Sequence, residues 1–114
     1  MGAYTFLKSG GNCNVNTVQA SQLFESLSSP IRLAIFQQLS SMGSQGMIAG
    51  DLAKQLELAP NHLSFHLKTL SHTKLVTSQQ EGRFIRYHAN LNLMMELTRF
   101  LTENCCIHSH EQCC

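Results

Sequence analysis

Residues 60–71 read PNHLSFHLKTLS, and this stretch decides the fold. Leu63, Leu67 and Leu70 recur at i, i+4 and i+7, which places them on one stripe of an α-helix. A proline at position 60 suits the first residue of such a helix, because the N–H that it lacks would have no partner there. The stretch therefore predicts a helix that buries its leucines against a neighbour and presents its other side to solvent.

The outward side of this helix carries groups of the kind that contact nucleic acid. An α-helix fits the major groove of B-DNA when one face is packed on a partner and the exposed face is polar. Phe65 lies about 200° from Leu63 on a helical wheel, so we expect it outside the core, where it either touches a thymine methyl or packs onto a neighbouring loop. We expect the other outward side chains to donate to bases or phosphates, and the lysine to a phosphate: Asn61, His62, Ser64, His66 and Lys68.

The segments around this helix complete a mainly α-helical pattern with one β-hairpin. Apolar residues recur at helical spacing in four further segments, and two runs have the composition of strands. Ser29 followed by Pro30 is typical of a helix start. The expected elements are helices from Thr17, from Pro30, over 50–58, over 60–71 and over 91–104, a short strand within 46–49, and strands over 75–80 and 83–88.

The two strands after the central helix predict a basic hairpin. They are joined by Glu81 and Gly82, and glycine supplies the positive φ that a tight turn needs. Arg83 and Arg86 flank this tip, where they can reach the DNA backbone or minor groove. Residues 60–88 carry a net charge of +3, which leaves −2 for the rest of the chain. Two short helices followed by a basic hairpin make a winged helix-turn-helix of the mainly α, α+β class, and positive charge on one segment favours duplex DNA as the partner.

Length and composition indicate one small domain. The chain has 114 residues, of which 43% are hydrophobic. We expect a flexible arm over residues 1–16, the winged helix-turn-helix domain over 17–104 and a cysteine-rich tail over 105–114. No apolar run approaches the ~18–20 residues that a membrane helix needs, and the N-terminus lacks the pattern of a signal peptide. The expectation is a cytoplasmic protein that does not contact a membrane.

These motifs together resemble the ArsR/SmtB family of arsenic- and metal-responsive repressors. The resemblance covers about residues 23–101, and several linked motifs in order make it specific. It implies a homodimer joined through the first and last helices, which binds an inverted-repeat operator in double-stranded DNA and leaves it when an inducer binds. The matching stretches are residues 27–36 (LSSPIRLAIF, like L-x-x-P-x-R-L-x-I-L), 50–53 (GDLA), 63–70 (LSFHLKTL, like I-S-x-H-L-x-x-L), 75–76 and 81–87.

The chain departs from the family at three places. The family has a glycine just after the recognition helix, where this chain has Thr73 and Lys74. Because lysine in a left-handed cap costs ~1 kcal/mol, we expect this turn to differ. The family's C-x-C-D-L arsenic motif is IAGDL at residues 48–52, without thiols, and residues 90–92 do not supply the family's zinc ligands. Both usual inducer sites are therefore in doubt.

The cysteines point instead to an inducer site in the tail. Cys105, Cys106, Cys113 and Cys114 fall within the last ten residues. Trivalent arsenic is a soft centre that prefers three thiolates. The first two of these cysteines would supply two sulfurs, and the third would come from Cys113, Cys114 or Cys13. A methylated arsenical needs only two thiolates. We therefore expect As(III), as arsenite or a methylated arsenical, to act as the inducer.

Other readings of the tail remain open. His108 and His110 beside the thiols can complete a tetrahedral site for zinc or cadmium, and copper is a further candidate. Thiol oxidation is a second alternative. An enzyme is not expected, because the chain has neither a C-x-x-C redox motif at a helix start nor a glycine-rich cofactor loop. A metal-storage protein that uses only the tail would leave the basic helix and hairpin unexplained.

Overall fold

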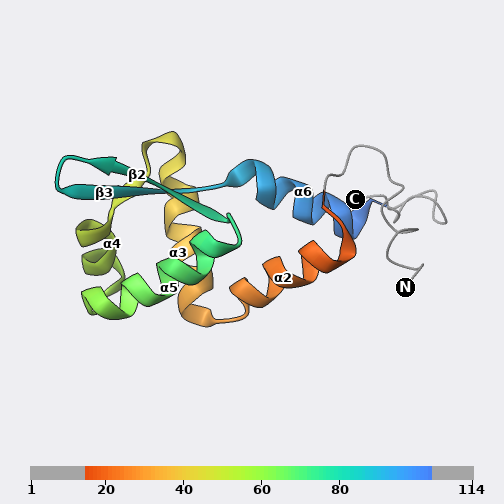
Figure 1. The fold of residues 1–114 in the computed structure, drawn as a ribbon, viewed down its shortest axis with the longest axis horizontal. Coiled ribbons are helices and arrows are strands. Elements are labelled where there is room, and N and C mark those ends of the chain that lie inside the picture. Colours follow the sequence, from red (N-terminus) through yellow and green to blue (C-terminus); the bar gives the residue numbers. More distant parts are fainter. Residues whose placement is uncertain (1–14, 104–114) are drawn as a thin grey trace.

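The computed structural model describes residues 15–103, and its elements follow the expected order (Figure 1). The tail over 105–114, most of the arm and all five cysteines lie outside the described residues. The elements are α2 (Thr17–Leu27), α3 (Pro30–Met42), the 3₁₀-helix η1 (Gly43–Gln45), β1 (Met47–Ile48), α4 (Ala49–Leu56), α5 (Pro60–His72), β2 (Val76–Glu81), β3 (Phe84–Ala89) and α6 (Leu91–Thr102).

The three strands form one antiparallel sheet in the order β1-β3-β2. The pairing of β2 with β3 runs to Glu81 opposite Phe84, which leaves Gly82 and Arg83 as the two-residue turn. Gly82 has a φ of +63°, a conformation that glycine adopts without steric cost. The predicted Glu81-Gly82 turn is therefore wrong by one residue. Glu81 still belongs to the ladder, and Arg83 occupies the tip.

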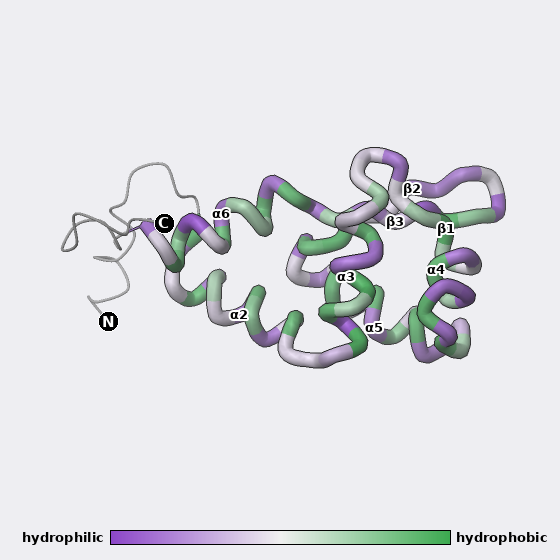
Figure 2. Tube along the Cα trace, turned by 180° about the vertical axis from the view of Figure 1, so that it is seen from behind, coloured by the Kyte–Doolittle hydropathy of each residue, from purple (hydrophilic) through white to green (hydrophobic). Residues whose placement is uncertain are grey.

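The core lies where α3, α4, α5 and the base of the hairpin meet, and α2 and α6 extend from it side by side (Figures 1 and 2). Helical periodicity places one stripe of each helix in this core. Among residues 15–103, every helix is too short or too polar to cross a bilayer. The buried apolar residues are Val15, Ala20, Leu23, Ile35, Phe36, Leu39, Leu52, Ala53, Leu63, Leu67, Leu70, Leu75, Val76 and Leu97.

Polar caps fix the starts of three helices. The side chain of Asn16 accepts a hydrogen bond from the backbone N–H of Gln19 at 2.8 Å, at the start of α2. Ser29 does the same for Arg32 at 3.3 Å, as the Ser29-Pro30 pair predicts. Asn90 caps α6 through Leu93, and its amide also donates to the carbonyl of Lys74 at 2.9 Å. Asn90 therefore ties the turn after α5 to the start of α6.

Helices α4 and α5 are each followed by a residue that has a left-handed backbone conformation although it is not glycine. Helix α4 ends at Leu56, two residues before the expected boundary, because Glu57 takes a φ of +55°. Lys74 after α5 has a φ of +73°. Its N–H donates to the carbonyl of Ser71 at 3.0 Å, and the N–H of Leu75 donates to Leu70 at 3.1 Å, which is the Schellman pattern of helix termination. The expectation that this turn differs is wrong: the turn keeps its left-handed geometry, and lysine occupies the glycine position.

Replacing Lys74 with glycine should raise the free energy of unfolding by about 1 kcal/mol, because glycine adopts a positive φ without a Cβ clash. The control is Lys74→Ala, which removes the long side chain but keeps the Cβ, and it should stay within about 0.5 kcal/mol of wild type. Urea denaturation measures both. Equal stability of the two variants would show that the backbone at this turn is not strained.

Candidate nucleic-acid interface

The recognition helix α5 packs by its leucine stripe, as predicted. Leu63, Leu67 and Leu70 are each no more than 2% exposed. Phe65 is 63% exposed on the opposite side, so it does not pack onto a loop. The predicted contact residues Asn61, His62, Ser64 and Lys68 are exposed as well. The packing thus leaves a polar surface with one protruding aromatic ring, while contact of this surface with DNA stays a prediction.

His66 is the exception on this helix. It is only 9% exposed, and its Nδ1 lies 3.3 Å from the guanidinium of Arg32. Because a guanidinium can only donate, Nδ1 accepts, and the proton of the neutral ring lies on Nε2. Burial, together with the positive charges of Arg32 and His62, lowers the pKa of His66 below its usual 6.5. The expectation that His66 faces DNA is wrong, since its ring belongs to a buried polar contact.

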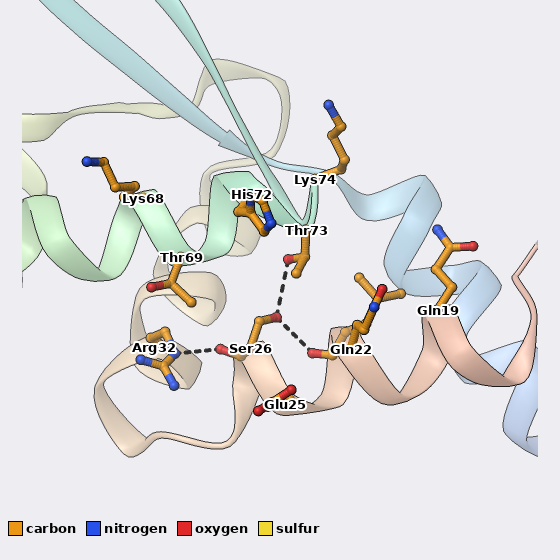
Figure 3. Close-up of a pocket in the computed structure, with 11 residues that line it drawn as sticks. Gln19, Gln22, Glu25, Ser26, Arg32, Lys68, Thr69, His72, Thr73 and Lys74 are labelled. Atoms are coloured by element: carbon orange, nitrogen blue, oxygen red, sulfur yellow. Dashed lines mark hydrogen bonds between the residues drawn. The ribbon is translucent and has the colours of Figure 1, made fainter.

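Arg32 links the recognition helix to α2. Its Nε donates to the carbonyl of Ser26 at 2.6 Å, near the end of α2, while its other arm meets His66 on α5. The hydroxyl of Ser26 is buried and receives a 3.3 Å hydrogen bond from Thr73, just after α5 (Figure 3). Sequence reasoning missed this role. The sequence did contain a signal for it. Arg32 lies two residues into α3 between apolar neighbours, and a charged side chain in such surroundings requires a polar partner inside the fold.

These contacts form the floor of a groove of about 730 Å³ between α2 and the C-terminal end of α5 (Figure 3). Gln22 and Glu25 of α2 form one wall, and Thr69 and His72 of α5 form the other. Arg32, at the base, is already held by the Ser26 carbonyl and by His66. The groove therefore marks the joint between α2 and the recognition helix.

The hairpin holds its two arginines differently. Arg83 is exposed in the turn. Arg86, within β3, forms a 2.8 Å ion pair with Glu81 and donates to the carbonyl of Gln45 in η1 at 3.1 Å. The expectation that both flank the tip is corrected: Arg83 is the tip, and Arg86 braces the hairpin against η1. Phe84, next to the tip, is 54% exposed, and nothing in the strand pattern distinguished it from an inward-facing residue.

No group of three or more histidine, cysteine or acidic side chains that could hold a metal ion occurs within residues 15–103. The predicted ligands Cys105, Cys106, Cys113 and Cys114 lie outside this range. The candidate site within the described residues is the exposed polar face of α5 together with the hairpin that carries Arg83 at its tip.

Comparison with known proteins identifies this arrangement. The model of a helix-turn-helix domain family matches residues 27–79. An ArsR-like transcriptional regulator from Rhodococcus sp. RHA1 is 30% identical, with a TM-score of 0.65 over 74% of this chain and 76% of that one. The chain belongs to the ArsR/SmtB family. It is a transcriptional regulator with a winged helix-turn-helix DNA-binding fold, and it is not an enzyme.

Further solved structures are similar to this fold. HlyU from Vibrio cholerae N16961 is 27% identical to this ArsR/SmtB member, with a TM-score of 0.62 over 75% of this chain and 92% of that one. A homodimeric winged helix-turn-helix DNA-binding domain from Mycobacterium bovis, at 18% identity, shares the fold with a TM-score of 0.61 over 82% and 87% of the two chains. No curated protein sequence matches the chain.

The contact between Arg32 and His66 predicts a pH dependence of stability. The unfolded ring binds a proton with a pKa near 6.5, and the folded ring does so only at lower pH, so the unfolded state binds more protons in between. Stability is therefore full above about pH 6.5 and is lost as the pH falls toward the lower, folded pKa. Urea midpoints between pH 7.5 and 5 measure this loss.

His66→Asn should flatten the pH dependence, because the asparagine oxygen can accept from Arg32 without titrating. His72→Asn, at an exposed position of the same helix, serves as the control and should keep the wild-type profile. The interpretation fails if the profiles of wild type and His66→Asn have the same slope.

Proposed function

We propose that this regulator is a cytoplasmic repressor, which binds operator DNA as a homodimer and is released when trivalent arsenic binds its C-terminal cysteines. The observation that carries the DNA-binding half is the outward face of α5. This face presents Asn61, Ser64 and Lys68 around the exposed ring of Phe65. Donors of this kind contact bases and phosphates, and an aromatic ring can contact the thymine methyl.

The proposed dimer rests on exposed apolar side chains of α2 and α6. Met95 and Leu101 of α6 are 57% and 61% exposed, and Val18 of α2 is 50% exposed. Leu91 and Met95 are four residues apart, so they lie on one face of α6. Apolar area of this kind is stabilised when a partner covers it, and a two-fold dimer would present the same face twice. The homodimeric domain from Mycobacterium bovis shares this fold.

Met95→Glu should convert the dimer to a monomer at micromolar concentration, because the dimer would have to bury an unpaired carboxylate. Operator affinity should fall at least roughly tenfold, since one half-site alone contributes less binding energy. Gln37→Glu, at an exposed polar position of α3 and away from the proposed interface, is the control and should stay dimeric. Sedimentation velocity measures the assembly, and a dimeric Met95→Glu variant would contradict this interface.

The proposed arsenic site lies in the tail that follows α6. The end of α6 lies beside the start of α2 (Figures 1 and 2). Cys105 and Cys106 follow Glu103 within three residues, and Cys13 precedes Val15 by two. Since a chain spans at most ~3.3–3.6 Å per residue, links this short are compatible with a site that draws on all three thiols. These short links support Cys13 as a candidate third ligand beside the cysteines at 113 and 114.

Binding at this end would act on the proposed dimer interface. An ion that ties the start of α2 to the end of α6 changes how the two subunits meet. Half-sites lie ~34 Å apart for one helical turn of DNA, so a small rotation would displace both recognition helices together. Allosteric couplings of ~1–3 kcal/mol are typical. Zinc, cadmium, copper or oxidation of the same thiols would act through the same geometry, and these are the alternative inducers.

Arsenite should lower the operator affinity of the wild type roughly five- to 150-fold, and Cys105→Ser should abolish this response while it keeps its affinity without arsenite. A mobility shift with arsenite, a methylated arsenical, zinc, cadmium and peroxide measures it. Cys13→Ser tests the third thiolate, because it should weaken the response to arsenite and leave the response to the methylated form intact. Release by zinc but not by arsenite would remove the arsenic assignment.

A further inference from the structure

The cleft between α5 and the hairpin is lined by hydrogen-bond donors. It has a volume of about 480 Å³, and its polar lining consists of Asn61, Ser64, Lys68 and Ser71 of α5, with Ser78 of β2 and Tyr87 of β3. Leu67 and Phe65 supply its apolar lining. Ser78 and Tyr87 are direct cross-strand partners, so their side chains lie on the same face of the sheet. The cleft thus joins the recognition helix to the hairpin.

The donors of this cleft are available. Within residues 15–103, the hydroxyls of Ser64, Ser71 and Ser78, the phenol of Tyr87 and the ammonium of Lys68 have no hydrogen-bond partner. This differs from the other side of α5, where a threonine hydroxyl at position 69 donates back to the Phe65 carbonyl at 3.4 Å. Asn61 accepts from the N–H of the next residue through its oxygen, which leaves its amide N–H groups to donate.

The cleft also lacks an acidic side chain. The nearest carboxylate along the hairpin, Glu81, is paired with Arg86. A set of neutral donors with a single ammonium and no carboxylate selects an oxyanion over a cation. Sites for drug-sized ligands are lined mostly by apolar groups with few polar ones, whereas hydroxyl, amide and lysine donors are the usual partners of DNA phosphates. The lining therefore favours a phosphodiester over a small apolar ligand.

We propose that this cleft seats the phosphodiester backbone of one DNA strand, and this inference rests on the proposed function. When a recognition helix lies in the major groove and the adjacent hairpin reaches the neighbouring minor groove, the strand between the two grooves passes between helix and hairpin. That space is the cleft. Ser78 and Tyr87 are then DNA-positioning residues, which bind phosphate oxygens and fix the register of α5 without reading sequence.

The test compares affinities for a selected operator and for a random duplex at several salt concentrations. Ser78→Ala and Tyr87→Phe should each weaken binding to both duplexes about five- to tenfold, so the ratio of the two affinities stays at its wild-type value. Because neither variant changes charge, the slope of log affinity against log salt should also stay unchanged. Lys68→Gln should weaken binding to both duplexes and reduce the magnitude of the slope by ~1.8, because the dimer loses two phosphate contacts at ~0.9 each.

Two control variants match these changes. Thr77→Ala lies next to Ser78 on β2, with its side chain on the other face of the sheet, and Lys54→Gln removes a lysine of α4 that does not line the cleft. Neither should change the affinity by more than about twofold. Thermal melting checks that the Tyr87→Phe variant, which keeps the aromatic ring, is still folded.

A duplex with a neutral methylphosphonate at each position in turn locates the seat. At one position in each half-site the effect of Ser78→Ala should become smaller, and with both of these positions replaced it should disappear, because the phosphate oxygens that the two Ser78 hydroxyls contact are already uncharged. The proposal is overturned if Ser78→Ala and Tyr87→Phe bind both duplexes with wild-type affinity. It is also overturned if these variants lose affinity for the operator alone, because that result indicates contact with bases. A wild type that binds no duplex would instead overturn the proposed function itself, and with it this inference.

Discussion

The burial of one leucine stripe determines which surface this protein offers to DNA. Leu63, Leu67 and Leu70 are almost fully enclosed by the core, and each such side chain contributes ~1.5–3 kcal/mol through the apolar area that it removes from water. A rotation of α5 by one residue would expose part of this stripe, so packing sets the rotation of the helix. The exposed ring of Phe65 and the donors around it follow from that rotation.

A second constraint is polar and acts between elements. Arg32 contacts the end of α2 through the Ser26 carbonyl and α5 through His66. Hydrogen bonds that involve a charged group are stronger than neutral ones, and loss of one partner leaves the other buried and unsatisfied. Asn90 forms a comparable bridge between the turn at Lys74 and α6. The recognition helix is thereby connected at its middle and at its end to the two helices of the proposed dimer interface, which is the arrangement that an induced change would need.

Residue periodicity predicted the helices well, because burial imposes a 3.6-residue repeat that the sequence displays. Periodicity failed at positions where the surroundings of a single residue determine its orientation or its backbone conformation. His66 lies about 40° beyond Leu70 on the helical wheel, at the border of the leucine stripe, where periodicity alone does not decide between an inward and an outward position. The hairpin turn moved by one residue because strand pairing retains Glu81. Lys74 takes a glycine conformation because the Schellman bonds and the burial of Leu75 hold the turn. The proposed inducer rests on cysteines that lie outside the described residues, so this part of the account rests on the sequence alone.

The central claim is that the outward face of α5 lies in the major groove of specific DNA. The most direct measurement is methylation interference at guanine N7, an atom of the major groove, on duplexes selected from a random library at ~0.15 M salt. We expect two patches of interference, with centres ~10–10.5 base pairs apart and arranged as an inverted repeat. Failure to enrich any sequence over random duplex, or specific binding that methylation of N7 leaves untouched, would contradict the account.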